Sequence, residues 1–254
     1  MSYGHAQHTT GSGPAEAAGA ARRPGRPGKQ GLYDPGYEHD ACGVAFVVDA
    51  TGRRTHTIIE HGLTALHNLD HRGAAGAEPS SGDGAGILLQ LPDAFLRAVV
   101  DFALPEVAAD GASRYAAGLV FMPEGDGARA ELERTIVTIA AGCGVTVLGW
   151  RDVPIRPDGV GPTARSTMPA FAHVFIAGTE GESGLDLERL AYRLRKRIEH
   201  ETGTYVVSLS SRTLVYKGML TTDQLGAFFP DLGDERLESA IALVHSRFST
   251  NTFP

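Results

Sequence analysis

The sequence has little cysteine. Only two of its 254 residues are cysteines, Cys42 and Cys143. Their spacing fits no zinc motif, and two cysteines are too few for a disulfide framework in a chain of this length. The composition therefore argues against a disulfide-stabilised secreted domain, and we expect a reducing, cytoplasmic location.

The sequence also lacks long apolar runs and a surplus of positive charge. No apolar stretch reaches the length of about 18 residues that a membrane span needs, and residues 1–30 lack the apolar segment of a secretory signal. The chain carries 23 Lys and Arg against 30 Asp and Glu, a net charge of −7, and its only dense basic run, residues 193–197, is typical of a solvated helix face. We expect neither a membrane nor a nucleic acid as a partner.

Residues 1–31 are rich in Gly, Ala, Pro, Ser and Arg and predict a disordered leader. Cys42 stands where the patterned sequence begins, in front of an apolar run. Cleavage between Ala41 and Cys42 would give one residue both the thiol and a free α-amino group, whose pKa of about 7.7 to 8.0 suits a general base. We therefore predict that residues 1–41 are a propeptide removed on maturation and that Cys42 is a nucleophile. Taken alone, Cys42 would fit better as a small buried hydrophobe in an edge strand, which is what most unpaired cysteines are.

The periodicity of apolar residues predicts an α+β fold with antiparallel sheets, because several strands follow one another without an intervening helix. A proline-rich linker is expected at 153–169, and residues 205–210 and 213–216 are expected to pair as a hairpin. Further strands are predicted at 43–49, 87–91, 115–122, 145–150, 170–177 and 240–247, and helices at 59–73, 92–101, 128–141, 185–201 and 221–229.

Two histidines in the first predicted helix have the spacing of a zinc-binding helix. His67 and His71 are four residues apart, but the segment offers no third ligand and no glutamate between them. We therefore expect no metal, and exposed or helix-capping histidines instead.

The glycine-rich segment 80–86 resembles a phosphate-binding loop in composition only. Nucleotide-binding loops follow a strand and open a helix, whereas this one opens the strand predicted at 87–91. Its glycines are better explained by a close approach of the backbone to another element or to a small polar substrate.

Near its C-terminal end the sequence places Arg247 at the end of a predicted strand, followed by the hydroxyls of Ser249 and Thr250. A guanidinium group is planar and permanently charged, so it can hold a substrate carboxylate through two parallel hydrogen bonds. The alternative is a surface arginine with polar neighbours.

Four segments together resemble the glutaminase domain of glutamate synthase large subunits, a class II amidotransferase domain. They are residues 40–44, 69–74, 82–87 and 245–252, which occur in the family's order within 31–254. The resemblance implies the N-terminal nucleophile (Ntn) hydrolase fold, a four-layer αββα sandwich of antiparallel sheets. It also implies that residues 42–254 form the glutaminase domain without its C-terminal part.

The resemblance implies hydrolysis of L-glutamine to glutamate and ammonia. Cys42 would be the nucleophile and its own α-amino group the base; Arg247 would bind the substrate α-carboxylate, with Ser249 and Thr250 lining the pocket. Arg72 would belong to a mobile element near Cys42. The family's Asn-Gly oxyanion hole and an aspartate for the substrate amino group would follow Pro254, and losing one oxyanion donor costs about 10² to 10³ in rate. The isolated chain is therefore expected to be inactive or nearly so.

In the full-length enzyme the resemblance implies FMN and an iron-sulfur cluster in downstream synthase domains, where the ammonia converts 2-oxoglutarate to glutamate. No cofactor is expected within these 254 residues. The implied partners are L-glutamine, the downstream domains and an NADPH-dependent small subunit. Two alternatives stay open: another amide hydrolase with an N-terminal cysteine, and a non-catalytic binding or assembly domain in which Cys42 is a core residue.

Overall fold

The computed structural model describes residues 29–31, 43–72, 78 and 80–246. The chain divides into two compact units, Met1–His39 and Asp40–Pro254, and the helices and strands described below belong to the second unit. Among the described residues, no helix combines the length and the apolar character that crossing a membrane requires.

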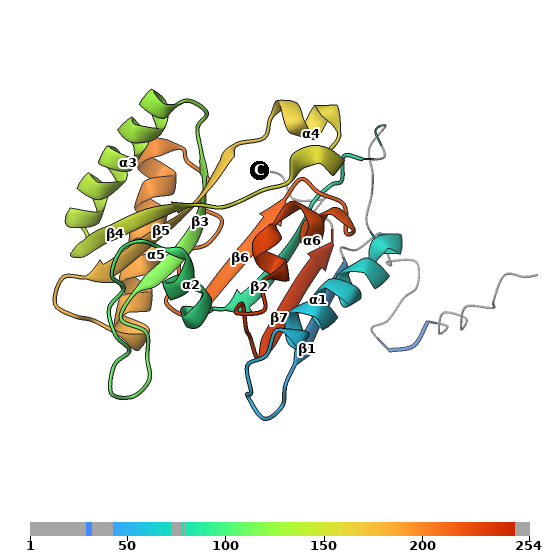
Figure 1. Cartoon of the computed structure of the whole chain (residues 1–254), viewed down its shortest axis with the longest axis horizontal. Helices are drawn as coiled ribbons and strands as arrows, with labels where there is room; N and C mark the ends of the chain where they lie inside the picture. Colours follow the sequence, from blue (N-terminus) through green and yellow to red (C-terminus); the bar gives the residue numbers. More distant parts are fainter. Residues whose placement is uncertain (1–28, 32–42, 73–77, 79, 247–254) are drawn as a thin grey trace, which may run out of the picture. The chain divides into compact units, whose positions relative to one another are not determined.

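The first sheet contains four antiparallel strands in the order β1-β7-β2-β6. These strands are β1 (Gly43–Val48), β7 (Ile241–Ser246), β2 (Ala85–Gln90) and β6 (Thr213–Gly218). The helix α1 (Thr57–Asn68) packs on β1 and β7 (Figure 1).

The helix α1 forms because its apolar residues recur on one face and are buried against the sheet. Ile59 and Leu66 are fully buried there. At Gly62 the helix approaches so closely that an added Cβ would lie 2.7 Å from the Cβ of Ala242. The predicted helix is confirmed, although it ends at Asn68 and continues as the 3₁₀ turn η2 (Asp70–Arg72).

The second sheet has the order β3-β5-β4, again antiparallel. Its strands are β3 (Ala116–Met122), β5 (Ala170–Gly178) and β4 (Val145–Asp152). Residues 206–210 lie along the free side of β3, through antiparallel bridges that join Ala117 to Ser210 and Val120 to Val206.

The predicted hairpin between residues 205–210 and 213–216 is wrong. Strand β6 pairs with β2, and the preceding segment pairs with β3 in the other sheet. Glu188 explains the change of sheet, since its carboxylate accepts hydrogen bonds from the Ser210 hydroxyl at 2.7 Å and from the Ser211 backbone N–H and hydroxyl, both at 2.8 Å. These side-chain hydrogen bonds hold the bend where the chain passes from one sheet to the next.

The helices α3 (Asp126–Ala141) and α5 (Gly184–Thr202) cover one face of the second sheet. The order along the chain is therefore strand, helix, strand, strand, helix, strand, when residues 206–210 are counted as the last strand. With strand order 206–210, β3, β5, β4, this is the split β-α-β arrangement of ferredoxin-like domains. We call residues 116–210 the βαββαβ module, which Figure 1 shows beside the first sheet.

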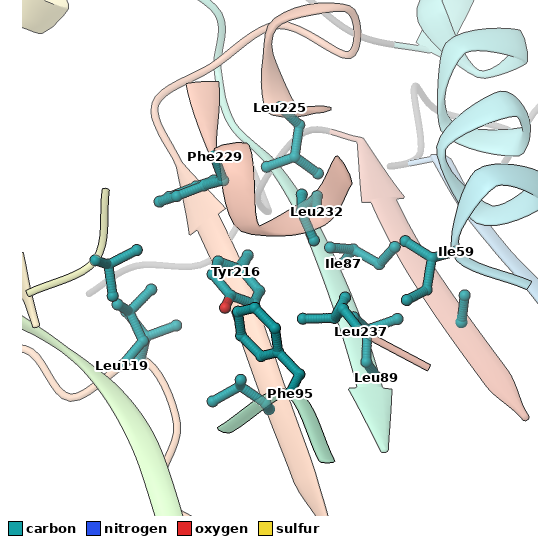
Figure 2. Close-up of a cluster of buried hydrophobic side chains, with 14 of the residues drawn as sticks. Ile59, Ile87, Leu89, Phe95, Leu119, Tyr216, Leu225, Phe229, Leu232 and Leu237 are labelled. Atoms are coloured by element: carbon teal, nitrogen blue, oxygen red, sulfur yellow. The ribbon is translucent and has the colours of Figure 1, made fainter. Parts of the chain in front are cut away.

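The two sheets share one hydrophobic core. Figure 2 shows Ile87, Leu89 and Tyr216 of the first sheet in the same cluster as Leu119 of β3 and Phe229. Short elements complete the core: α2 (Asp93–Val99), α6 (Gln224–Phe228) and η4 (Pro230–Gly233). The predicted proline-rich linker contains two further short helices, η3 (Pro157–Gly159) and α4 (Pro162–Ser166).

A buried polar cluster crosses this core. Arg151 of β4 makes a two-pronged ion pair with Asp231 of η4, with N···O distances of 2.7 and 2.8 Å, and the Tyr216 hydroxyl donates to the same carboxylate at 2.8 Å. His173 lies beside Arg151 and is completely buried; burial and the arginine charge lower its pKa to about 3, so its imidazole is neutral. The cluster ties the βαββαβ module to the first sheet.

The face of the first sheet opposite α1 exposes apolar side chains. Val44, Phe46 and Val48 of β1 are exposed by 53, 66 and 52%, and Leu243 of β7 by 37%. Leu243 lies opposite Phe46, so the four side chains form one apolar row.

Candidate active site

One end of the first sheet brings together the segments that the sequence analysis singled out. Gly43 begins β1 and lies opposite Ser246, the last residue of β7. Ala85 begins β2 and lies between Ser246 and Gly218, the last residue of β6. We call this row, Gly43, Ser246, Ala85 and Gly218, the candidate end of the sheet.

Four of the five predicted site residues, Cys42, Arg247, Ser249 and Thr250, lie outside the described residues. The fifth, Arg72, has its backbone in η2, and its side chain also lies outside the described part. Cys42 precedes Gly43 and Arg247 follows Ser246, each by one peptide bond. The structure therefore places the residues bonded to the predicted nucleophile and to the predicted carboxylate-binding arginine directly opposite each other.

At the candidate end, the glycine-rich loop lies directly against the backbone of the segment that follows β6. A Cβ on Gly82 would lie 2.3 Å from the carbonyl oxygen of Leu220 and 2.5 Å from the amide nitrogen of Thr221. Gly84, with φ of +129°, turns the chain into β2 at Ala85. The predicted close approach is confirmed, and so is the prediction that this loop opens a strand.

The end of α1 and η2 are fastened to the segment that follows Leu220. The Thr222 hydroxyl donates a hydrogen bond of 2.8 Å to Asp70. His67 and Asp223 form an exposed ion pair with an N···O distance of 2.5 Å, and this hydrogen bond to Asp223 raises the pKa of His67. Both contacts hold η2, and with it the backbone of Arg72, next to the chain that leaves β6.

The two helix histidines have separate partners. His67 of α1 contacts Asp223, whereas His71 lies in η2, and its Nδ1 is 3.0 Å from the carbonyl oxygen of Asn68, the last residue of α1. In the described part of the chain, no group of three or more His, Cys, Asp or Glu side chains is arranged to hold a metal ion.

Two polar residues at the end of β7 were not singled out from the sequence. The hydroxyl of Ser246 is buried and finds no hydrogen-bond partner among the described residues. His245 lies on the other face of the strand, in one row with Val44, Gly86 and Lys217. Burial and the nearby Lys217 charge lower the pKa of His245. The two-residue period of a strand was the available signal, since it separates His245 from Ser246 by face.

The second cysteine has a structural environment. Cys143 follows α3 and is 1% exposed, and its sulfur accepts a hydrogen bond of 3.5 Å from the guanidinium of Arg197 in α5. It contributes to the core beneath the helices of the βαββαβ module.

A sequence model of the family described as "Glutamine amidotransferases class-II" matches residues 42–254. The chain belongs to this family. Class II glutamine amidotransferases have the Ntn hydrolase fold, and the α+β class with two antiparallel sheets and flanking helices, predicted from the sequence, is confirmed. The matched region begins at Cys42.

Its curated relatives are glutamate synthases. The chain is 45% identical over 235 residues to the "Glutamate synthase [NADPH] large chain" of Bacillus subtilis, covering 90% of this chain and 15% of that protein. It is 38% identical over 232 residues to the large chain of Azospirillum brasilense, covering 87% and 15%. It is 38% identical over 226 residues to "Ferredoxin-dependent glutamate synthase 2, chloroplastic" of Arabidopsis thaliana, covering 85% and 14%. The chain thus spans about 15% of the length of these relatives.

Proposed function

We propose that the chain is the glutaminase domain of a glutamate synthase and hydrolyses L-glutamine to glutamate and ammonia. The observation that carries this proposal is the pairing of Gly43 with Ser246. It brings together two strand ends that are followed or preceded in the sequence by Arg247, the proposed carboxylate ligand, and Cys42, the proposed nucleophile, and the family match begins at Cys42. An amidotransferase that acts on a free amino acid needs both groups in one site.

The proposed reaction begins after residues 1–41 are removed, when Cys42 carries a free α-amino group. The amine takes the thiol proton, and the thiolate attacks the side-chain amide carbon of glutamine to give a tetrahedral oxyanion. The oxyanion collapses, the carbon–nitrogen bond breaks, and ammonia leaves with a proton from the α-ammonium group. Water then cleaves the γ-glutamyl thioester, which releases glutamate and restores the thiol.

The proposed binding roles follow from the arrangement of the candidate end. Arg247 would bind the α-carboxylate, and Ser249 and Thr250 would line the pocket beside it. Arg72 would approach from η2, which Asp70 and Thr222 fasten to this end of the sheet. The contact of Gly82 with the backbone after β6 supports the same arrangement, since it closes the loop in front of β2.

The relatives' names support a larger protein in which the ammonia is used. We propose that downstream domains bind FMN and an iron-sulfur cluster and convert 2-oxoglutarate to glutamate, with an NADPH-dependent small subunit as electron donor, in the cytoplasm. These 254 residues do not fit the cluster, because such clusters take about four cysteines and the chain has two, one of them buried against Arg197. The cluster would therefore be held outside this chain.

The deciding experiment is the intact mass of the full-length protein from its own cells, with and without a glutamine-analogue diazo-ketone. We expect loss of residues 1–41 and one label on Cys42. A Cys42→Ser variant is the control and should take no label. A wild-type protein that retains its leader and takes no label would show that Cys42 is structural, and the glutaminase proposal would be abandoned.

A further inference from the structure

A cavity lies at the end of the first sheet opposite the candidate end. Its volume is about 320 Å³, within the range of small-molecule sites. One wall is formed by Arg54, the end of β2 and the start of α2. The other is formed by Gly184, the first residue of α5, and by Ser113, Ser211 and Arg212, which flank the βαββαβ module in the sequence. A molecule in this cavity would touch both the module and the first sheet.

Two exposed arginines line the cavity, and most of their N–H donors have no partner in the described part of the chain. The guanidinium of Arg54 donates one hydrogen bond, of 3.2 Å, to the carbonyl oxygen of Leu91. That of Arg212 makes no hydrogen bond or ion pair within the described part of the chain. A guanidinium group has five N–H donors in a planar fork that matches carboxylate and phosphate oxygens.

The carboxylates near the cavity are already engaged. Asp93 accepts from Arg97 at 2.9 Å and from the Tyr115 hydroxyl at 2.9 Å. Glu188 accepts three hydrogen bonds from Ser210 and Ser211. Of the charged residues that line the cavity, Asp93 is therefore paired with a cation, whereas Arg54 and Arg212 have no carboxylate partner in the described part of the chain. Glu188 keeps its negative charge, because its three hydrogen-bond donors are uncharged.

The first turn of α5 also borders the cavity. Gly184, the first residue of this 19-residue helix, lines the cavity, and the preceding Ser183 gives no side-chain capping hydrogen bond. The first backbone N–H groups of a helix have no partner within it, and the helix dipole places partial positive charge there. This partial charge has the same sign as the two arginines, and Asp186 in the same turn is paired with Arg189.

We propose that this cavity binds a small anionic metabolite through its carboxylate or phosphate oxygens, held by Arg54 and Arg212. Because the walls belong to the module and to the first sheet, the bound anion strengthens the contact between them. The site lies beyond the proposed glutaminase reaction, and its occupancy is measurable whether or not glutamine is hydrolysed.

The test is calorimetric titration of the full-length protein with inorganic phosphate and, separately, with succinate, at constant ionic strength. We expect saturable binding of at least one probe, and the tighter of the two identifies the preferred oxyanion. Each guanidinium contact is a charge-assisted hydrogen bond, so Arg212→Gln should weaken binding roughly tenfold and Arg54→Gln/Arg212→Gln should abolish it. Arg156→Gln, which changes an exposed arginine outside the cavity, is the matched control.

A second measurement uses the wild-type protein alone. Phenylglyoxal modifies accessible arginines of the wild-type protein, and the preferred probe should protect Arg54 and Arg212 while Arg156 stays reactive. Binding that the double variant retains, equal protection of all three arginines, or no saturable binding of either probe would overturn the proposal.

Discussion

Removing the carboxylate of Asp231 should strongly destabilise the chain. Asp231 is 4% exposed and Arg151 is 12% exposed, so Asp231→Ala would leave a guanidinium buried without its counter-charge. Breaking a buried ion pair by removing one partner costs about 3 to 5 kcal/mol. The Tyr216 hydroxyl loses its acceptor in the same variant, which adds to the cost.

Urea unfolding followed by the fluorescence of Trp150, the single tryptophan of the sequence, measures this effect next to Arg151. With an m value of about 2 kcal/mol per M, the unfolding midpoint should fall by about 2 M. Asp234→Ala is the matched control, because Asp234 also meets an arginine through two hydrogen bonds, at 2.9 and 2.6 Å, but Arg236 is 54% exposed. Exposed pairs contribute about 0 to 1 kcal/mol.

A paired apolar replacement separates the charge from the packing. Arg151→Met/Asp231→Leu removes both charges, so it should recover the stability that the unpaired charge costs, while the Tyr216 hydroxyl stays without its acceptor. Equal and small shifts for Asp231→Ala and Asp234→Ala would refute the reasoning, since burial would then have no influence on the cost.

Three further predictions concern the candidate active site. Arg247→Ala should raise the KM for glutamine sharply and leave Cys42 alkylation by a small electrophile intact, whereas an amide hydrolase that needs no α-carboxylate would keep its KM. Gly82→Ala should lower the unfolding midpoint and the glutaminase activity of the full-length protein together, because its methyl group has no room beside the backbone carbonyl; unchanged values would contradict the close contact. The ion pair of His67 with Asp223 should stabilise the fold below about pH 6.5 and lose this effect as pH rises through the raised pKa of His67. In an NMR titration, the pKa of His67 should be lower in Asp223→Asn than in the wild-type protein. An unchanged pKa would rule out the ion pair as the cause of the shift.

Local patterns were sufficient to predict most helices and strands. The helix at 185–201 was predicted from apolar residues at three- and four-residue spacings, and α5 buries Leu187, Leu194 and Ile198 as expected. The hairpin prediction failed because the competing interaction is not local. Glu188 lies more than twenty residues before the bend that it holds, and sequence periodicity contains no information on such a contact.

The candidate site was predictable as a set of residue types but not as a geometry. The chemistry of a cysteine behind a removable leader and of an arginine followed by hydroxyls suggested Cys42 and Arg247. That Gly43 lies opposite Ser246 depends on the register of strands nearly two hundred residues apart. The ion pair of Arg151 with Asp231 was missed for the same reason, since neither residue has a sequence signal of burial.

The bridge between Ala117 and Ser210 means that the βαββαβ module begins and ends at neighbouring points. A segment whose two ends lie side by side can be inserted or removed without moving the rest of the chain. Asp231 and Tyr216 lie outside the module, so the loss of Arg151 would leave the Asp231 carboxylate in the core with the Tyr216 hydroxyl and no cation. A homologue that lacked this segment would need another positive charge at that point, or other residues in place of Asp231 and Tyr216.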